Sequence, residues 1–324
     1  MTINRRTMMT CAGLAAVTTM AGTLPGTTVA AATPKTGSPL PGALRRRIGD
    51  IEVTALLDGY LNVQEALLVG FDPAEARTLA EAMFQTPGAQ RIPVTAYLVN
   101  TGGKLILVDA GSANTFGPTL GKLPEALRAV GVTPADIDML AITHLHPDHI
   151  NGALKPDGSA LFPNAELVVS ETDHIFWNDD GFLTQADEHV RGFFHGARKG
   201  VAAYQKRLRL FTDGAEIAPG IRAMALPGHT PGHTGFRIDS GKDSLLIWGD
   251  VAHIATYQFA RPDWGISFDT DIEQARTTRK KVLDQVATDR LMVAGMHLPF
   301  PGFGYVAREG NGYRFVPAEW PYAF

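Results

Sequence analysis

Four side chains that commonly bind metal ions lie within six residues near the middle of the chain. The segment Thr143-His144-Leu145-His146-Pro147-Asp148-His149 follows the short apolar run 139–142. Imidazole and carboxylate groups at this density cannot all find ordinary partners in a protein interior. An extended segment points His144 and His146 the same way, and the following turn directs Asp148 and His149 toward a second ion. We therefore predict a metal site at this segment.

Three more candidate ligands each follow a later apolar run. They are His229 in Pro227-Gly228-His229, Asp250 in Trp248-Gly249-Asp250 and His297 in Gly295-Met296-His297. If Asp250 bridges two ions, His144, His146 and His229 complete one shell, and Asp148, His149 and His297 complete the other. Two ions about 3.5–4 Å apart can share a water and lower its pKa toward neutrality. The pattern predicts a hydrolase that needs no serine nucleophile, with Asp148 as a catalytic group that orients the hydroxide and shuttles a proton.

Each ligand segment requires a strand to hold it, and the apolar runs predict those strands. We expect strands at 51–57, 96–99, 105–108, 139–142, 166–169, 221–226, 235–238, 244–248 and 291–294, and helices at 123–130 and 272–286. The first strand alternates in the manner of an edge strand. Residues 178–210 are expected to form helices that cap the site. The shape of the pocket is expected to depend on residues 57–95, taken as a loop, and on the segment 178–200. Sites at strand ends are typical of layered α/β folds.

Composition limits the classes of partner. The chain has 324 residues, of which 45% are hydrophobic and 19% charged, enough for one large domain or two small ones with a buried core. Its net charge is −4, and −6 without residues 1–32, whose only charges are Arg5 and Arg6. This balance argues against nucleic acid or an anionic membrane as a partner.

The N-terminus is typical of an export signal. The pair Arg5-Arg6 precedes the apolar stretch 8–24 and the small residues 29–32, which predicts a cleaved twin-arginine-type signal over residues 1–32. An uncleaved membrane anchor and a general secretory signal are the alternatives, and the small residues disfavour the anchor. We predict a flexible leader at 33–45, one folded domain at 46–324, and a periplasmic or secreted product without a membrane partner. The only cysteine, Cys11, lies in the signal, so the mature chain has no thiolate ligand.

The ordered set of seven ligands resembles the metallo-β-lactamase superfamily from about residue 50 to the end. This resemblance implies an α/β fold, an αββα sandwich of two packed mixed sheets flanked by helices, with the metal cleft at one edge. It also implies that His229 is a ligand and that His233 is a structural group. Two divalent ions are expected, zinc first, with Mn, Co and Fe as alternatives because His/Asp sites accept several metals. Members that use a cysteine ligand, or a Glu at the position of His146, are disfavoured.

Longer stretches resemble the methyl parathion hydrolase family. They are residues 96–102, 116–121, 192–194, 297–302 and 312–317. The resemblance implies an exported homodimer that acts on aryl phosphotriesters, with related lactonases and arylesterases. It further implies that Phe116, Trp177 and Phe193 line an aromatic pocket for a flat leaving group. Plain core packing is the alternative for Trp177 and Phe193.

Two residues beyond Asp250 are predicted to complete the substrate pocket. His253 lies three residues after Asp250, and Ile266 lies in the loop that follows. The related phosphotriesterases carry an apolar residue near the position of His253. This departure favours a lactone or ester, whose carbonyl or leaving group a histidine can bind by a hydrogen bond. A solvent-facing loop histidine is the alternative.

These features together predict a binuclear hydrolase of small neutral lactones and aryl esters. Aryl phosphotriesters are expected as promiscuous substrates, cleaved through a metal-bridging hydroxide. A glyoxalase-type thioesterase would share all seven ligands but should carry a basic patch for its anionic thiol carrier, and the sequence shows only scattered lysines such as Lys199, Lys206, Lys280 and Lys281. A non-catalytic periplasmic metal-binding protein is the third hypothesis.

Overall fold

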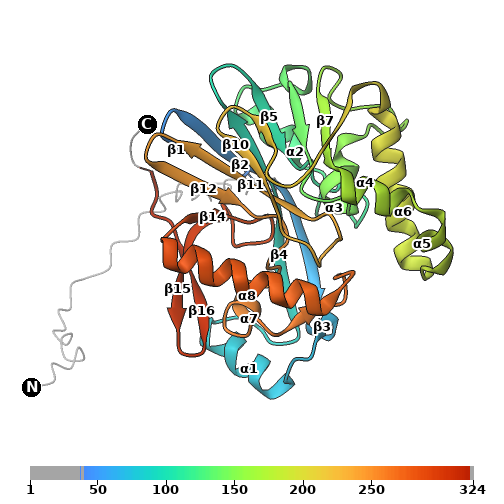
Figure 1. The fold of residues 1–324 in the computed structure, drawn as a ribbon. Coiled ribbons are helices and arrows are strands. Elements are labelled where there is room, and N and C mark those ends of the chain that lie inside the picture. The colour runs from blue at the N-terminus through green and yellow to red at the C-terminus, as the bar shows by residue number, and fades with distance from the viewer. Residues whose placement is uncertain (1–36, 38–39, 322–324) are drawn as a thin grey trace, which may run out of the picture. The chain divides into compact units, whose positions relative to one another are not determined.

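Two seven-stranded sheets pack face to face in the computed structural model, which describes residues 37 and 40–321 (Figure 1). Residues 40–321 form one compact unit. The predicted signal lies outside the described residues, and so does the leader up to residue 39 apart from Gly37. No helix in the part of the chain that the structure describes is long and apolar enough to cross a membrane.

The first sheet has the strand order β1-β2-β4-β5-β6-β7-β8. Its strands are β1 (Ala43–Ile48), β2 (Ile51–Gln64), β4 (Ala89–Asn100), β5 (Leu105–Val108), β6 (Met139–Ala141), β7 (Glu166–Ser170) and β8 (Leu208–Phe211). The strands from β1 to β5 pair antiparallel, whereas β5 to β8 pair parallel. The sheet is therefore mixed, as the family resemblance implied.

The prediction that 51–57 is an edge strand was wrong. The edge strand is β1, which begins at Ala43, so the predicted leader at 33–45 extends three residues too far. Three consecutive arginines, at 45–47, hide the strand signal in β1, although Leu44 and Ile48 are buried in the core. With β1 beside it, β2 pairs with a neighbour on both sides.

The expected loop at 57–95 contains the outer half of a long two-stranded ribbon, with a short strand and a helix between its two strands. The pairing of β2 with β4 runs from Glu52 opposite Asn100 to Gln64 opposite Ala89. Its register shifts between Leu57 and Gly59, a bulge that leaves Asp58 unpaired in the ladder. The ribbon extends beyond the rest of the sheet, so its outer half lacks the continuous apolar run of a buried strand.

The second sheet has the order β16-β15-β14-β12-β11-β10-β9. Its strands are β9 (Glu216–Ala218), β10 (Ile221–Ala225), β11 (Thr234–Ser240), β12 (Asp243–Ile247), β14 (Met292–Ala294), β15 (Phe303–Glu309) and β16 (Gly312–Pro317). Only β12 and β14 pair parallel. The predicted strands of this half are confirmed to within two residues, whereas the hairpin β15–β16 was not predicted.

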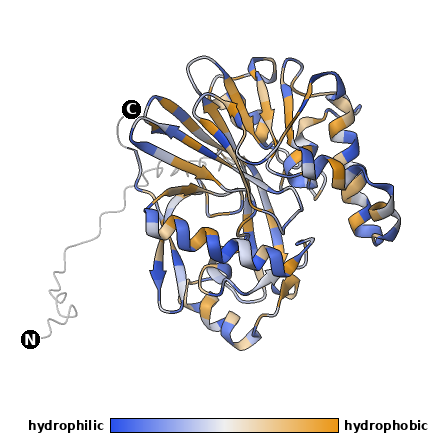
Figure 2. Ribbon diagram, viewed as in Figure 1, coloured by the Kyte–Doolittle hydropathy of each residue, from blue (hydrophilic) through white to orange (hydrophobic). Residues whose placement is uncertain are grey.

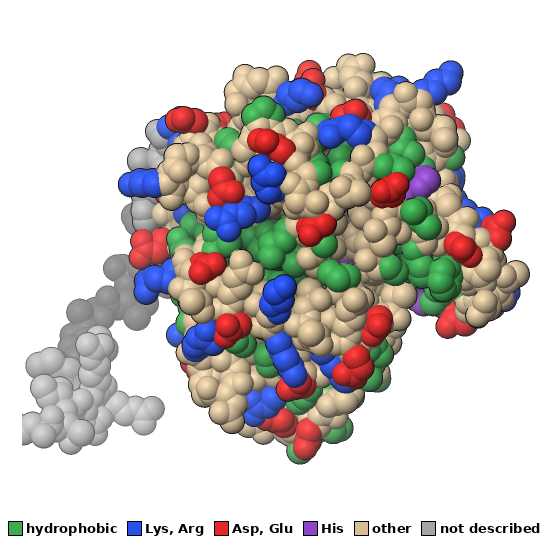
Figure 3. Space-filling model, in the orientation of Figure 1, with side chains coloured by type: hydrophobic (Ala, Val, Ile, Leu, Met, Phe, Trp, Pro, Cys, Tyr) green, Lys and Arg blue, Asp and Glu red, His purple; other side chains and the backbone are tan. Residues whose placement is uncertain are grey.

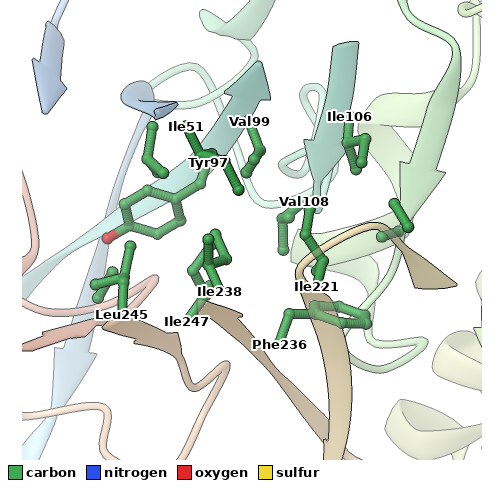
Figure 4. Close-up of a cluster of buried hydrophobic side chains, with 14 of the residues drawn as sticks. Ile51, Tyr97, Val99, Ile106, Val108, Ile221, Phe236, Ile238, Leu245 and Ile247 are labelled. Atoms are coloured by element: carbon green, nitrogen blue, oxygen red, sulfur yellow. The ribbon is translucent and has the colours of Figure 1, made fainter. Parts of the chain in front are cut away.

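The main core lies between the two sheets. Tyr97 and Val108 of the first sheet face Phe236, Ile238 and Ile247 of the second in one continuous apolar layer (Figure 4). The Tyr97 hydroxyl donates to the Gly295 carbonyl at 3.0 Å, which satisfies its one polar atom. This layer joins the two sheets into a single sandwich.

Helices cover both outer faces of the sandwich. On the first sheet they are α2 (Leu123–Ala129), α4 (Glu171–Asn178), α5 (Asp180–Gln185) and α6 (Glu188–Ala203), and on the second α8 (Ile272–Asp289). These helices alternate apolar and polar residues along their length (Figure 2). The predicted helices are confirmed, and the αββα sandwich is the observed fold.

A small lobe lies at the end of the β2–β4 ribbon. It contains α1 (Pro73–Ala82), α7 (Ala255–Gln258) and the two-stranded pair of β3 (Leu68–Val69) with β13 (Gly265–Ile266). Its own apolar cluster includes Val63, Tyr257, Trp264 and Ile266. Acidic and basic side chains are interspersed over the face of the molecule seen in Figure 3.

Candidate metal centre

The dense ligand segment leaves β6 and enters a short helix, α3 (Pro147–Ile150). The neighbouring strand β5 ends at Val108, and Asp109 follows it with a left-handed backbone (φ 59°). The Asp109 carboxylate accepts from the Thr143 backbone N–H and from the Thr143 hydroxyl, both at 2.8 Å. It also accepts from His149 Nδ1 at 2.7 Å. One buried carboxylate thus fixes both ends of the ligand segment.

The three later ligands reach the same point from the second sheet. His229 follows β10, Asp250 follows β12, and His297 follows β14. The polar atoms of His144, His146 and His229 lie within 4.8 Å of one another, and so do those of Asp148, His149 and His297. The structure therefore brings together the two predicted groups of three, and their binding of metal stays a prediction.

Asp250 lies between these two groups, as expected of a bridging ligand. Its Oδ2 atom is 3.4 Å from His229 Nε2 and 3.7 Å from His144 Nε2 on one side. On the other side it is 3.3 Å from His149 Nε2 and 3.2 Å from His297 Nε2. A carboxylate in this place can contact ions held by either group.

Outer hydrogen bonds orient four of the imidazoles. The Nδ1 atom of His149 donates to Asp109, that of His229 to Asp269 at 2.9 Å, and that of His297 to the Pro93 carbonyl at 2.8 Å. His144 Nδ1 lies 3.1 Å from the Thr143 hydroxyl. All four rings consequently present Nε2 to the centre, which is the arrangement that second partners of metal-bound histidines produce.

The charges of the centre call for cations. Burial opposes ionisation of Asp250, but the surrounding histidines, His149 foremost, hold its pKa well below the ordinary value. Burial also opposes a charge on His149, yet Asp250, Asp148 and Asp109 raise its pKa well above the ordinary value. The carboxylates are thus ionised and need positive charge beside them. Divalent ions supply that charge and use the imidazoles as ligands.

Unpaired polar atoms support the same conclusion. Among the described residues, buried Asp250 Oδ1 and His149 Nε2 have no hydrogen-bond partner. A buried acceptor without a partner costs free energy, about 1–3 kcal/mol in typical proteins. A bound cation would satisfy both atoms, so the residues present fit a metal site.

His233 has the structural role expected of it. Its Nδ1 atom donates to the Leu226 carbonyl at 2.7 Å, and its Nε2 atom accepts from the Asp250 backbone N–H at 2.9 Å. Burial lowers the pKa of His233 to about 3, so the ring is neutral. It ties the end of β10 to the segment that carries Asp250.

A cavity of about 280 Å³ opens onto the cluster. Phe116 and Phe193 line it, with ring centroids 6.5 Å apart, as do the predicted pocket residue His253 and the predicted ligand Asp148. Its remaining lining is Leu61, Asn62, Val63, Leu67, Ile92, His146, His189, His229, Asp250, Phe268 and His297. The β2–β4 ribbon and α6 therefore form its walls.

Two predicted pocket residues lie outside this cavity. Trp177 is buried behind His146, with ring centroids 5.4 Å apart, and its indole N–H donates to Asp173 at 3.2 Å. Ile266 is buried in the small lobe, where its backbone N–H donates to Asp269 at 3.2 Å. Trp177 packs against the predicted ligand His146, and Ile266 contacts the aspartate that orients His229. The sequence placed them in the pocket because a large apolar side chain suits a buried core as well as a pocket.

His253 is not the solvent-facing histidine that the alternative interpretation required. It is buried, its ring stacks on that of His297 at 5.4 Å, and its Nε2 lies 3.1 Å from Asp250 Oδ2. With His229 and Asp250 it forms a further group whose polar atoms lie within 4.8 Å. Burial lowers the pKa of His253 to about 4. His253 thus lies as close to Asp250 as the predicted ligands do.

Several supporting residues were missed by the sequence analysis. Asp109 and Asp269 orient His149 and His229, and buried Arg279 lies 3.7 Å from Asp269. The Gln258 side-chain oxygen accepts from the backbone N–H groups of His253, at 2.7 Å, and Ile254, at 3.1 Å. These four residues are isolated polar residues in the sequence and belong to no motif. Asp109 alone carried a signal, since it directly follows the apolar run 105–108.

Comparisons with known proteins agree with this geometry. The family model of the metallo-beta-lactamase superfamily matches residues 89–297, which include all seven predicted ligands. An N-acyl homoserine lactonase of Bacillus sp is 24% identical over 252 residues, which cover 72% of this chain and 89% of the lactonase.

Solved structures match over most of the chain. The hydrolase AbOPH superposes with a TM-score of 0.83 and 33% identity, covering 87% of this chain and 99% of AbOPH. AidC, described as a dizinc quorum-quenching lactonase, gives a TM-score of 0.82 and 30% identity, covering 86% of this chain and 98% of AidC. From its ligand cluster, its fold and these relatives, the chain belongs to the metallo-β-lactamase superfamily and is a metal-dependent hydrolase of the lactonase type.

Proposed function

We propose that this protein hydrolyses small neutral lactones and aryl esters, with slower hydrolysis of aryl phosphotriesters, at two divalent ions. The observation that carries the proposal is the lining of the metal-site cavity. It joins the ligand cluster to aliphatic and aromatic side chains and contains no Lys or Arg. A cavity of this kind favours an uncharged, largely apolar substrate.

The ions would be held by the two groups of three ligands with Asp250 between them. When bound, divalent ions polarise a carbonyl or phosphoryl oxygen and lower the pKa of water. Zinc is the ion we propose first, supported by the dizinc centre named for AidC. The buried, unpaired atoms of Asp250 and His149 support occupancy by cations on grounds internal to the chain.

Asp148 is the proposed proton carrier. Its side chain is 13% exposed and lines the cavity, whereas that of Asp250 is 3% exposed. The surrounding charges, against the effect of burial, hold the pKa of Asp148 well below its ordinary value, with His149 the largest contributor. An ionised carboxylate at the cavity surface can accept a proton from water and orient it.

Three other residues are proposed to bind the substrate. Phe116 and Phe193 offer ring faces and edges to an acyl chain or an aryl leaving group. His253 lines the cavity, and its Nε2 lies 3.1 Å from Asp250 Oδ2, whereas its Nδ1 has no partner among the described residues. The ring therefore has a nitrogen available to hydrogen-bond a carbonyl or leaving-group oxygen. AidC was solved in complex with an N-acyl homoserine product, which supports a lactone with an acyl side chain as the first substrate to test.

The test is a substrate panel measured before and after removal of metal. It comprises an N-acyl homoserine lactone, an aryl acetate, an aryl phosphotriester and a glutathione thioester, each assayed with native, chelated and zinc-reloaded enzyme. We expect the neutral substrates to be hydrolysed, with activity lost on chelation and restored by zinc. Efficient turnover of only the anionic thioester would instead support the glyoxalase-type alternative, and absence of chelator-sensitive ester hydrolysis would refute the proposal.

A further inference from the structure

A second cavity lies beside the metal-site cavity, and the loop 113–122 and α6 contribute residues to both. Its volume is about 1010 Å³, and it is lined by the loop 113–122, the segment 151–156 and α6. In the loop, Phe116 lines the metal-site cavity, whereas Thr115 and Gly117 line the second one. In α6, Phe193 lines the first and Lys199 the second. The two cavities therefore share both elements.

The second cavity, here called the lysine cavity, concentrates positive charge. Lys122, Lys155 and Lys199 line it, which is three of the nine lysines in the chain. His195 also lines it, and the lining contains no Asp or Glu. The whole chain has a net charge of −4, so this concentration is a local feature and not a reflection of composition.

The three ammonium groups form no direct ion pair among residues 40–321, although Asp157 lies near enough to Lys155 for their charges to interact. None of them forms an ion pair with a described carboxylate, and all three lysines are exposed. A Cβ built on Gly158 would lie 3.6 Å from Lys199 Nζ, so this amine lies beside the turn that follows Lys155. Like charges around one hollow raise the positive potential inside it and attract anions.

The loop between the cavities is tied to the metal centre. Asp58, at the bulge in β2, accepts from the backbone N–H groups of Ser112 and Leu123 at the two ends of the loop, both at 3.0 Å. Asn151, two residues after His149, donates to the Thr115 hydroxyl at 2.9 Å. An occupant of the lysine cavity would therefore contact a loop whose opposite side carries Phe116.

We propose that the lysine cavity binds a small molecule with two or more anionic groups, such as phosphates or carboxylates, and that this occupant acts on the substrate site through the loop 113–122. The cavity is large enough for a metabolite-sized ligand. Binding itself is independent of the proposed hydrolase function. Only the effect on the substrate site rests on that function.

The first test measures binding of naphthalene-1,3,6-trisulfonate to the metal-loaded enzyme by fluorescence titration. Sulfonates are weak ligands for divalent ions, so the probe does not strip the metal centre. We expect saturable binding with one site per chain, weakened by added salt because the contacts are exposed charges. The triple variant Lys122→Gln, Lys155→Gln, Lys199→Gln should bind about tenfold more weakly. The matched control Lys206→Gln, an exposed lysine outside the cavity, should bind as the unaltered enzyme does.

Either of two results would overturn the binding proposal. One is the absence of saturation, and the other is equal affinity of the unaltered enzyme and the triple variant. Because all three lysines are exposed, the triple variant should fold normally, and its thermal melting and metal content check this.

The second test measures the effect on hydrolysis. With saturating trisulfonate, the KM for an aryl ester should change at least about twofold in the unaltered enzyme and in Lys206→Gln, and not in the triple variant. An unchanged KM in all three proteins would refute the coupling while the titration still decides binding. If no ester is hydrolysed at all, the proposed function fails and the titration is unaffected.

Discussion

The metal-site cavity and the lysine cavity share two elements, the loop 113–122 and α6, yet their charged groups differ in burial and in partners. In the metal site the charged groups are buried, and outer partners such as Asp109 and Asp269 fix their orientation. In the lysine cavity they are exposed and unpaired among the described residues. The buried, oriented groups of the metal site meet the need of catalysis for precise geometry. The exposed ammonium groups attract anions through their charge without fixing the position of the anion.

The largest expected effect comes from the bridging carboxylate. Asp250→Asn keeps the shape but removes the charge beside four predicted ligands, so metal content should fall and ester hydrolysis should drop on the order of a thousandfold. Metal analysis and kcat/KM for an aryl ester measure this. Binding of trisulfonate to the lysine cavity should persist, which would separate the two sites.

The matched control is Asp50→Asn, which alters an exposed aspartate in the turn after β1. It should retain full metal content and activity. Normal activity of Asp250→Asn at normal metal content would contradict the assignment of Asp250 as the bridging ligand.

A smaller effect is expected from the residues that orient the ligands. Asp109→Asn places an amide where His149 Nδ1 and the Thr143 backbone both donate, so one of these hydrogen bonds must be lost. Metal affinity should fall about 10–100-fold, the usual range for such outer partners. Competition with a coloured chelator measures this affinity.

Zinc in excess distinguishes positioning from a direct catalytic role. It should restore most of the kcat of Asp109→Asn, whereas a catalytic group would leave kcat low at full occupancy. Unchanged zinc affinity would show that Asp109 does not act through His149.

The aromatic wall should affect substrate binding more than turnover. Phe116 is 37% exposed and touches no predicted ligand in the ring contacts, so Phe116→Ala should leave the metals in place. Loss of its contact with an aryl group should raise KM about three- to tenfold, equivalent to about 1 kcal/mol. The control Phe182→Ala removes an exposed ring of α5 outside both cavities and should leave KM unchanged. An equal KM for both variants would exclude Phe116 from the substrate site.

The sequence predicted the ligand cluster because the signals for it are local. His144, His146, Asp148 and His149 are neighbours, and His229, Asp250 and His297 each follow an apolar run that became β10, β12 or β14. Strand ends converge at one edge of a layered fold, so local signals were enough to bring the seven residues together.

The rest of the site depends on tertiary packing, which single residues do not reveal. Lys122, Lys155 and Lys199 are widely spaced in the sequence and meet only because the loop, the turn after η3 (Asn151–Ala153) and α6 lie around one cavity. Trp177 and Ile266 were misplaced for a related reason. A large apolar side chain fits a pocket or a core equally well, and burial behind His146 or in the small lobe decides between them.

The smallest expected effect tests the element that the two cavities share. Asp58→Asn replaces one of the two acceptors that close the loop 113–122 with a donor, so the loop should loosen and stability should fall by about 1 kcal/mol. Burial raises the pKa of Asp58 above its ordinary value, so ionisation of the native carboxylate costs stability as pH rises through that pKa. The neutral amide of the variant does not ionise, so the variant loses little stability relative to the native protein at neutral pH. In acid, where the native carboxyl is protonated, the variant loses more.

If the loop couples the cavities, both the KM of Asp58→Asn for an aryl ester and its Kd for trisulfonate should rise about twofold. A change in only one of these constants would mean that the two cavities share a wall without sharing its motion.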